Sequence, residues 1–223
     1  LALVGAKSAL PGAPAMLANL QRMNRETQTV ATGGEGAATW LGRYWGKINA
    51  GAGPVQDEWA PRIEYRLPRA RYGGEVDLAR LLEKLLRARP SLDAAAQELQ
   101  VAASERAAFE RAYGATELAL RGWLVALRGG TESARLLRLA YETNPHDRWI
   151  GFALADAMYG TLEQARASGR SERDALRAIL EVRPDHAETL RRLWHLERSA
   201  GDSAAGQYRA RLAEASPLDK EVR

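Results

Sequence analysis

The sequence contains no cysteine. A chain without thiols has no disulfides, no thiolate nucleophile and no Cys-based metal site. The same absence fits a reducing compartment, and we expect a cytoplasmic protein. Long apolar runs are missing too. The apolar start of the chain is interrupted by Lys7, Pro11 and Pro14, so it falls short of the roughly 20 residues that a membrane helix needs. We expect no membrane insertion of this segment.

Histidine is scarce, with His146, His186 and His195 as the three examples. No two of them are spaced to bind one metal ion from a single helix face, so no metal site is predicted. His146 and His186 each follow a proline closely, and we interpret both as residues that start helices. No Ser/His/Asp set or lysine nucleophile is discernible, so no catalytic residue is predicted.

Charge of one sign is not concentrated anywhere. Lys and Arg total 32 against 28 acidic residues, and the two signs alternate along the chain. A nucleic-acid binder usually gathers its basic residues into a patch or stripe. The pattern instead indicates solvated helix faces, and we expect no nucleic-acid partner.

A stretch at residues 53–69, with three prolines, divides the chain into two unlike parts. Before it, residues 1–4 form a short apolar run that suits a buried strand, although its length leaves a helix possible. Pro14 then opens a helix with one apolar face. Within the stretch, residues 62–67 alternate polar and apolar side chains, which is the period of a half-buried strand. The first part therefore has the features of an α/β domain.

Two further features of this first part have more than one interpretation. Residues 32–36 are glycine-rich; we favour a mobile loop, with a lid over an upstream site as the alternative. Residues 37–48 are predicted to form a helix. The aromatic residues in and beyond that helix either pack in a core or line a ligand cleft. They are Trp40, Tyr44, Trp45 and Trp59.

Gly73 and Gly74 are predicted to be a hinge between residues 1–73 and residues 74–223. From Val76 onward apolar residues recur at helical spacing. Ser91 is a candidate N-cap. The helix predicted over 102–128 is expected to be interrupted at Gly114. Gly129 and Gly130 should end it, and the next helix should run through Tyr141.

The remaining helices are punctuated by Pro145, Pro184 and Pro217, which lie 39 and 33 residues apart. The second interval is close to the 34-residue period of tetratricopeptide repeats. Helix pairs of this kind bury a continuous core by stacking, so about three pairs are expected. We predict tetratricopeptide-like helix pairs; the alternative is an irregular helical bundle.

Acidic residues near the first part's end are the candidate substrate-binding residues. Asp57, Glu58 and Glu64 could act as acid–base groups or bind a cationic amine, and the plainer alternative is a solvated acidic loop beside a strand. Tyr65 follows directly in the predicted strand.

Residues 1–10, the short helices after them and residues 57–69 together resemble the end of the spermidine synthase-like proteins. The likeness is closest to a bacterial branch in which the synthase domain follows membrane helices and carries a helical tail. Matches to the segment that ends that domain are Pro61, Ile63, Glu64, Tyr65, Pro68 and Arg69. The resemblance implies a Rossmann-like methyltransferase fold, decarboxylated S-adenosylmethionine as aminopropyl donor and a polyamine acceptor. The chain departs from the pattern at Trp59, which is inserted before Ala60 and Pro61.

The family's nucleotide loop and catalytic aspartate would lie upstream of Leu1, so no cofactor-binding residue is assigned here. We therefore expect a mainly α chain: the end of an α/β synthase-like domain followed by tetratricopeptide-like helices. The resemblance implies an upstream membrane tether. The helical part would serve packing or interaction, with the rest of its own chain or a protein partner, and would not catalyse alone. The alternative is a non-enzymatic helical scaffold that binds a peptide in a groove lined by Arg and Tyr side chains.

Overall fold

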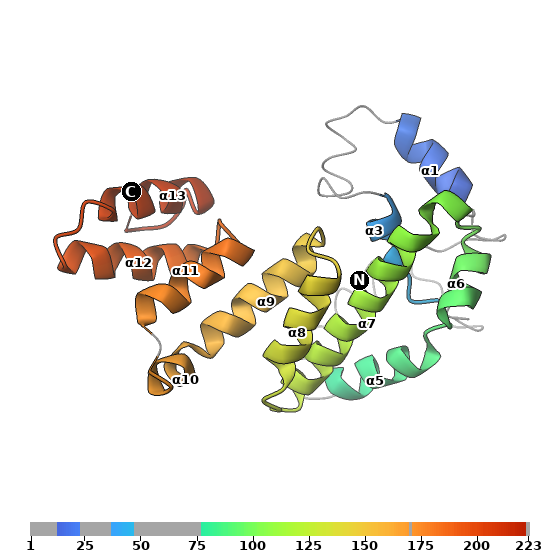
Figure 1. Cartoon of the computed structure of the whole chain (residues 1–223), viewed down its shortest axis with the longest axis horizontal. Coiled ribbons are helices and arrows are strands. Elements are labelled where there is room, and N and C mark those ends of the chain that lie inside the picture. Colours follow the sequence, from blue (N-terminus) through green and yellow to red (C-terminus); the bar gives the residue numbers. More distant parts are fainter. Residues whose placement is uncertain (1–12, 23–36, 47–76, 170, 222–223) are drawn as a thin grey trace, which may run out of the picture. The chain divides into compact units, whose positions relative to one another are not determined.

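The computed structural model describes residues 13–22, 37–46, 77–169 and 171–221, and every regular element within these ranges is a helix (Figure 1). The mainly helical class is therefore confirmed. The strands predicted at 1–4 and 62–67, the loop at 32–36 and the hinge at 73–74 lie outside the described residues, so the predicted domain boundary stays a prediction.

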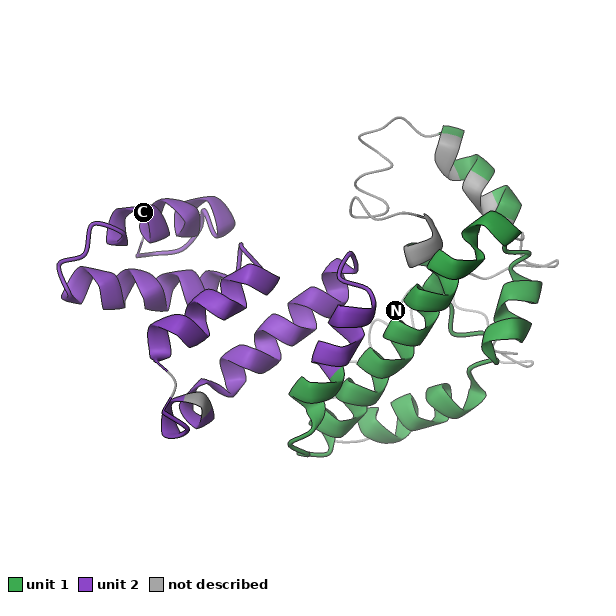
Figure 2. Cartoon of the chain, viewed as in Figure 1, with its two compact units in different colours: residues 1–136 green, residues 137–223 purple. Residues whose placement is uncertain are grey.

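The chain forms two compact units, residues 1–136 and 137–223, which are coloured separately in Figure 2. The boundary falls inside α8 (Ser133–Thr143). The described helices of unit 1 are α1 (Ala13–Arg22), α3 (Ala37–Gly42), α5 (Leu78–Ala88), α6 (Leu92–Glu98), the 3-10 turn η1 (Ala103–Glu105) and α7 (Arg106–Leu127). Those of unit 2 are α9 (Arg148–Gly160), α10 (Leu162–Ala167), α11 (Glu172–Val182), α12 (Ala187–Ser199) and α13 (Ala205–Ala215).

Helix starts agree with the sequence signals. Asp77 caps α5 by accepting a hydrogen bond from the Arg80 amide at 2.9 Å. Ser91 caps α6 as predicted, because its Oγ accepts the Ala94 amide at 3.3 Å. Each cap satisfies one of the amides that the first turn of a helix leaves without a partner.

Two predictions about helix ends were wrong. The helix expected over 37–48 ends at Gly42. The interruption expected at Gly114 is absent, since α7 runs unbroken from Arg106 to Leu127. A single glycine costs a helix only about 1 kcal/mol relative to alanine. The buried face of α7, which includes Phe109, Ala112 and Leu120, outweighs that cost.

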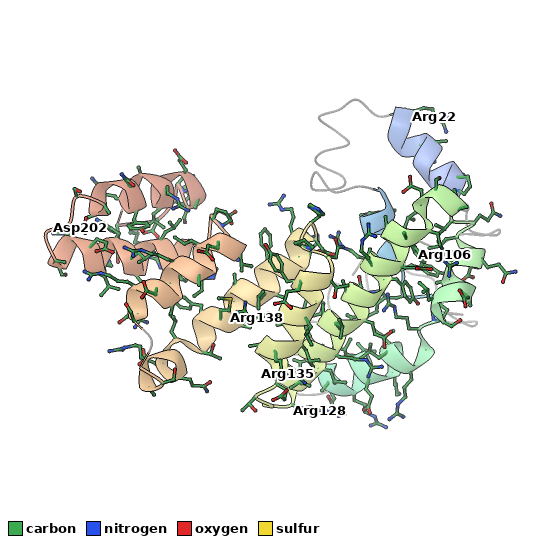
Figure 3. The ribbon with its side chains drawn as sticks, viewed as in Figure 1. Arg22, Arg106, Arg128, Arg135, Arg138 and Asp202 are labelled. Atoms are coloured by element: carbon green, nitrogen blue, oxygen red, sulfur yellow. The ribbon has the colours of Figure 1, made fainter. Side chains whose placement is uncertain are left out.

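Helix α7 is the central helix of unit 1, and α3, α5 and α6 all pack against it. Gly42 permits the approach of α3, because a Cβ there would lie 2.3 Å from the Ala112 Cβ. Arg106 and Arg128, near the two ends of α7 (Figure 3), form ion pairs with Glu110 at 2.7 Å and with Glu83 of α5 at 2.7 Å.

A buried arginine joins the segments of unit 1. The Arg89 side chain is 4% exposed and stacks on the Tyr113 ring, with 3.6 Å from the guanidinium carbon to the ring centre. Its Nη2 donates to the carbonyls of Gly42 and Tyr113 at 3.1 Å, and its Nε donates to the Tyr44 carbonyl at 3.3 Å. Burial lowers the pKa of Arg89.

Unit 2 is held by one apolar core that α9, α11, α12 and α13 share. Its fully buried members include Leu176 and Ile179 of α11, Leu190 and Leu193 of α12, and Leu212 of α13. Leu176 and Ile179 are three residues apart, as are Leu190 and Leu193, so each pair lies on one face of its helix.

Three proline turns in the chain share one hydrogen-bond pattern. In each, the residue before the proline donates its amide to a carbonyl four residues back, and its own carbonyl accepts the amide three residues on. The latter bonds measure 3.2, 3.2 and 3.0 Å. The residues that open and close these turns are Asn144 and Asp147, Arg183 and His186, and Ser216 and Asp219.

The closing residue of each turn also caps the chain that follows. Asp147 Oδ1 accepts the amides of Trp149 and Ile150 at 3.0 and 3.2 Å. His186 Nδ1 accepts the Thr189 amide at 3.2 Å, so the prediction that His186 starts a helix is confirmed. His146 lies one residue before the cap Asp147. Asp219 Oδ1 accepts the Glu221 amide at 2.9 Å.

Glycine turns alternate with the proline turns. Gly129, Gly169 and Gly201 have φ values of 72°, 82° and 68°, and each donates its amide to a carbonyl three residues back. A positive φ at the end of a helix favours glycine, since it lacks a Cβ. The chain therefore uses the same two turns three times in alternation.

Candidate binding pocket on α12

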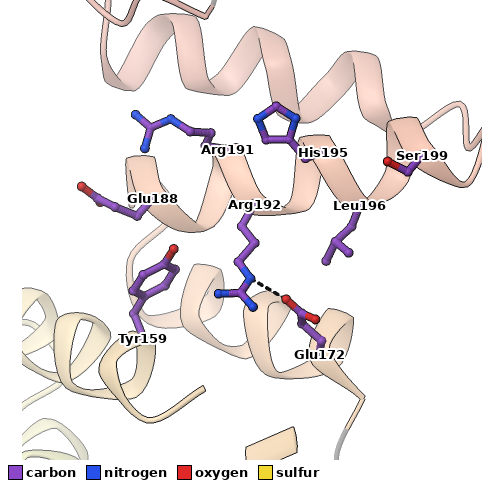
Figure 4. A pocket seen from close by; sticks show the side chains of 8 residues that line it. All are labelled: Tyr159, Glu172, Glu188, Arg191, Arg192, His195, Leu196 and Ser199. Atoms are coloured by element: carbon purple, nitrogen blue, oxygen red, sulfur yellow. Dashed lines mark hydrogen bonds and ion pairs between the residues drawn. The ribbon is translucent and has the colours of Figure 1, made fainter. Parts of the chain in front are cut away.

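A pocket of about 310 Å³ lies in unit 2 among α9, α11 and α12 (Figure 4). Helix α12 contributes most of its lining through one polar face, opposite the face that carries the buried Leu190 and Leu193. The lining residues are Tyr159, Glu172, Glu188, Arg191, Arg192, His195, Leu196 and Ser199.

Arg192 forms part of the frame of this pocket. It makes a hydrogen bond and ion pair with Glu172 of α11 and reaches Glu163 of α10 at 3.3 Å. In Figure 4 Arg192 and Glu172 point toward one another. Burial acts to lower the pKa of Arg192, but hydrogen bonds to Glu172, Glu163 and Tyr159 outweigh it, so the pKa is raised. Arg192 stays charged and fixed.

Arg191 and His195 lie at the pocket rim and are paired differently. Arg191 bonds to Asp219, and His195 Nε2 lies 2.8 Å from Glu221 Oε2. Both acidic residues follow α13. The hydrogen bond from Arg191 lowers the pKa of Asp219, and the same bond raises the pKa of Arg191.

The pocket contains a serine, a histidine and a carboxylate, but their geometry does not suit nucleophilic catalysis. A nucleophile needs a base within hydrogen-bond reach, about 2.6–3.2 Å. Within the described ranges no hydrogen bond joins Ser199 to His195, whose Nε2 faces Glu221. The arrangement can hold a ligand through charge, hydrogen bonds and the Tyr159 ring.

A second, wider pocket of about 400 Å³ lies between the turns at Pro145 and Pro184. Arg183 and Arg148 approach the Phe152 ring within it, at 4.2 and 5.2 Å from the ring centre. Arg183 also pairs with Asp156 at 3.2 Å. Arg183 thus joins the Pro184 turn to α9 as a structural contact, and the pocket beside α12 is the better candidate site.

The substrate-binding residues predicted from sequence, Asp57, Glu58, Glu64 and Tyr65, lie outside the described residues. Of the predicted aromatic group, Tyr44 donates to Glu98 Oε2 at 2.7 Å, which indicates a packing role in unit 1. Trp40 and Trp45 are at least partly exposed, and Trp59 is outside the described residues. The residues of the α12 pocket were not singled out from sequence as one site. Their spacing of three and four along 188–199 was the available signal.

The described ranges contain no helix long and apolar enough to cross a membrane, and no group of three metal-ligating side chains. No family model, no curated protein and no solved structure matches the chain.

Proposed function

We propose that the chain is a helical interaction module whose tetratricopeptide-like pairs bind a segment of a protein partner, and that it does not catalyse a reaction alone. The observation that carries this proposal is the alternation of glycine and proline turns, each used three times with the same hydrogen bonds. Stacked helix pairs of this kind commonly present their exposed helix faces to a partner.

The α12 pocket supports the same proposal. Its lining combines Arg191, Arg192 and Tyr159, which are the residue types expected for a peptide-binding groove. Arginine and tyrosine are enriched where proteins recognise partners, because each offers a large contact area together with hydrogen bonds.

The spermidine synthase-like identity remains a prediction for residues 1–69, most of which are outside the described ranges. If it is correct, the partner of the helical part is the remainder of its own protein. Decarboxylated S-adenosylmethionine and a polyamine would then be substrates of that remainder, and a cytoplasmic location with an inner-membrane tether is expected.

A steric block tests the proposed pocket. The experiment selects peptides from a random displayed library against the full chain. These peptides are expected to bind the variant Ser199→Trp at least about 10-fold more weakly than the parent chain. The indole would fill the pocket, and such a loss equals one unit of log K. Ser199 is exposed, so the change leaves the core intact.

The matched control is Ser203→Trp, at an exposed loop position outside the pocket lining. Equal loss in both variants, or no selectable peptide at all, would count against the proposed function.

A further inference from the structure

The rim of the α12 pocket already carries an acidic segment of the same chain. Asp219 pairs with Arg191, and Glu221 Oε2 lies 2.8 Å from His195 Nε2, so two carboxylates two residues apart face an arginine and a histidine four residues apart on α12. The Asp219 side chain is 6% exposed, and its Oδ1 also accepts the Glu221 amide. We call residues 218–221 the acidic strap.

The basic side chains of the pocket thus differ in their acidic partners. Arg192 is tied to Glu172 and Glu163, on the neighbouring helices α11 and α10. Arg191 forms its ion pair with Asp219 of the strap and His195 lies beside Glu221 of the strap, and the two side chains are 34% and 49% exposed. The strap is a short segment of turns after α13, so releasing it disturbs less than releasing α10 or α11.

We propose that the partner recognised at this pocket is an acidic peptide segment, and that the strap is an internal competitor which the partner displaces from Arg191 and His195. This inference rests on the proposed function of the pocket. Exposed Glu188 lines the same pocket. An acidic partner therefore has to replace the strap carboxylates, because adding carboxylates beside them would place like charges together.

Mass action sets the size of the effect. Each strap contact has at least one partner at the surface, and a contact of this kind shifts an equilibrium constant by about 1.4- to 5-fold. Releasing two such pairs should tighten binding of an acidic competitor by about 2- to 30-fold.

The test uses the full chain and a fluorescein-labelled peptide that copies residues 216–221, with both ends blocked. Binding is followed by fluorescence anisotropy at low salt. The variant Asp219→Asn with Glu221→Gln keeps the shape of the strap and removes its charges. It should bind the peptide about 2- to 30-fold more tightly than the parent chain. Adding Arg191→Met to that variant should abolish the gain.

The matched control removes two carboxylates elsewhere in unit 2, by Glu181→Gln with Glu214→Gln, both at exposed positions outside the pocket. An equal gain in this control would overturn the proposal, because it would reduce the effect to net charge. Unchanged binding in the strap variant would also overturn it. If library peptides still bind in the pocket while the strap variant shows no gain, the acidic partner is refuted and the proposed function stands.

Discussion

Unit 1 and unit 2 are both helical, yet different kinds of contact join their distant segments. In unit 1 the contacts converge on Arg89, whose guanidinium bonds to the carbonyls of Gly42, Tyr44 and Tyr113. In unit 2 the helices share an apolar core, and the connections repeat the same capped turns. We call Arg89 the hub of unit 1, because a change of this one residue removes all three contacts. In unit 2 each repeated turn contributes a small and similar part of the stability.

A second contrast concerns close approach. In unit 1, Gly42 lies where α3 meets α7, and a larger side chain at this position would overlap α7. In unit 2 the charged residue Glu197 is buried at 1% exposure, and Arg173 and Arg177 pair with it at 3.1 and 3.4 Å. We expect this buried carboxylate between two arginines of α11 to help set how α11 packs on α12.

The largest expected effect is on the hub. Arg89→Met should lower the free energy of unfolding by about 3–5 kcal/mol, because three partly buried carbonyls lose their donor. Chemical denaturation measures the loss, and amide hydrogen exchange locates it. Exchange should rise in α3 and α7 while α12 keeps its protection. Arg89→Lys should fall between, since an ammonium cannot form the same fork. Equal loosening of α12 would remove the contrast between the units.

Much of unit 2 could be predicted from the sequence because its signals are local. Prolines 39 and 33 residues apart, the glycine at 201 and the apolar spacing indicate the turns and the buried faces of α11 and α12. The tetratricopeptide-like interpretation stays a prediction, although the repeated turns support it. Unit 1 was less predictable. Nothing around Arg89 shows that its side chain will meet Gly42 and Tyr113, because those contacts depend on tertiary packing.

The error at Gly114 has the same cause. Glycine is a reasonable helix-break signal locally, but α7 is stabilised by its buried face. The candidate pocket was only partly foreseeable. Arg and Tyr were expected to line a groove, but the particular residues need α9, α11 and α12 to be placed together. The pairing of His195 with Glu221 depends on the path of the turn after α13, and the sequence pattern alone does not predict that path.

The next largest effect should come from close packing at Gly42. Gly42→Ala should destabilise unit 1 by about 1–3 kcal/mol, because the new Cβ would overlap Ala112 and α3 would have to move. Gly114→Ala is the matched control in α7, where nothing lies within 4 Å of the added Cβ. It should stabilise by about 0.5–1 kcal/mol through helix propensity. Thermal unfolding compares the two, and a shared sign would contradict the packing account.

The capped turns of unit 2 should give a smaller effect. Asp147→Ala should cost about 0.5–2 kcal/mol, the usual value of an N-cap, because the amides of Trp149 and Ile150 lose their acceptor. Asp147→Asn keeps an acceptor oxygen and should lose less. Denaturation curves should show a change confined to unit 2. A loss as large as that of Arg89→Met would mean that this turn is itself a hub.

The smallest effect on stability at neutral pH is expected from a change of Tyr44, and this effect should be the most specific to unit 1. Burial raises the pKa of Tyr44 above its ordinary value of about 10, and its hydrogen bond to Glu98 raises the pKa further. The unfolded chain therefore ionises this tyrosine at a lower pH than the folded chain does. Stability from the protonated phenol is complete below about pH 10 and declines as pH rises toward the folded pKa. Absorbance at 295 nm during a rapid alkaline titration should lose its latest phase in Tyr44→Phe. The unfolding free energy of that variant should also fall less steeply above pH 10. If Tyr44→Phe instead removed the earliest phase, Tyr44 would be exposed to solvent, and its hydrogen bond to Glu98 of α6 would be refuted.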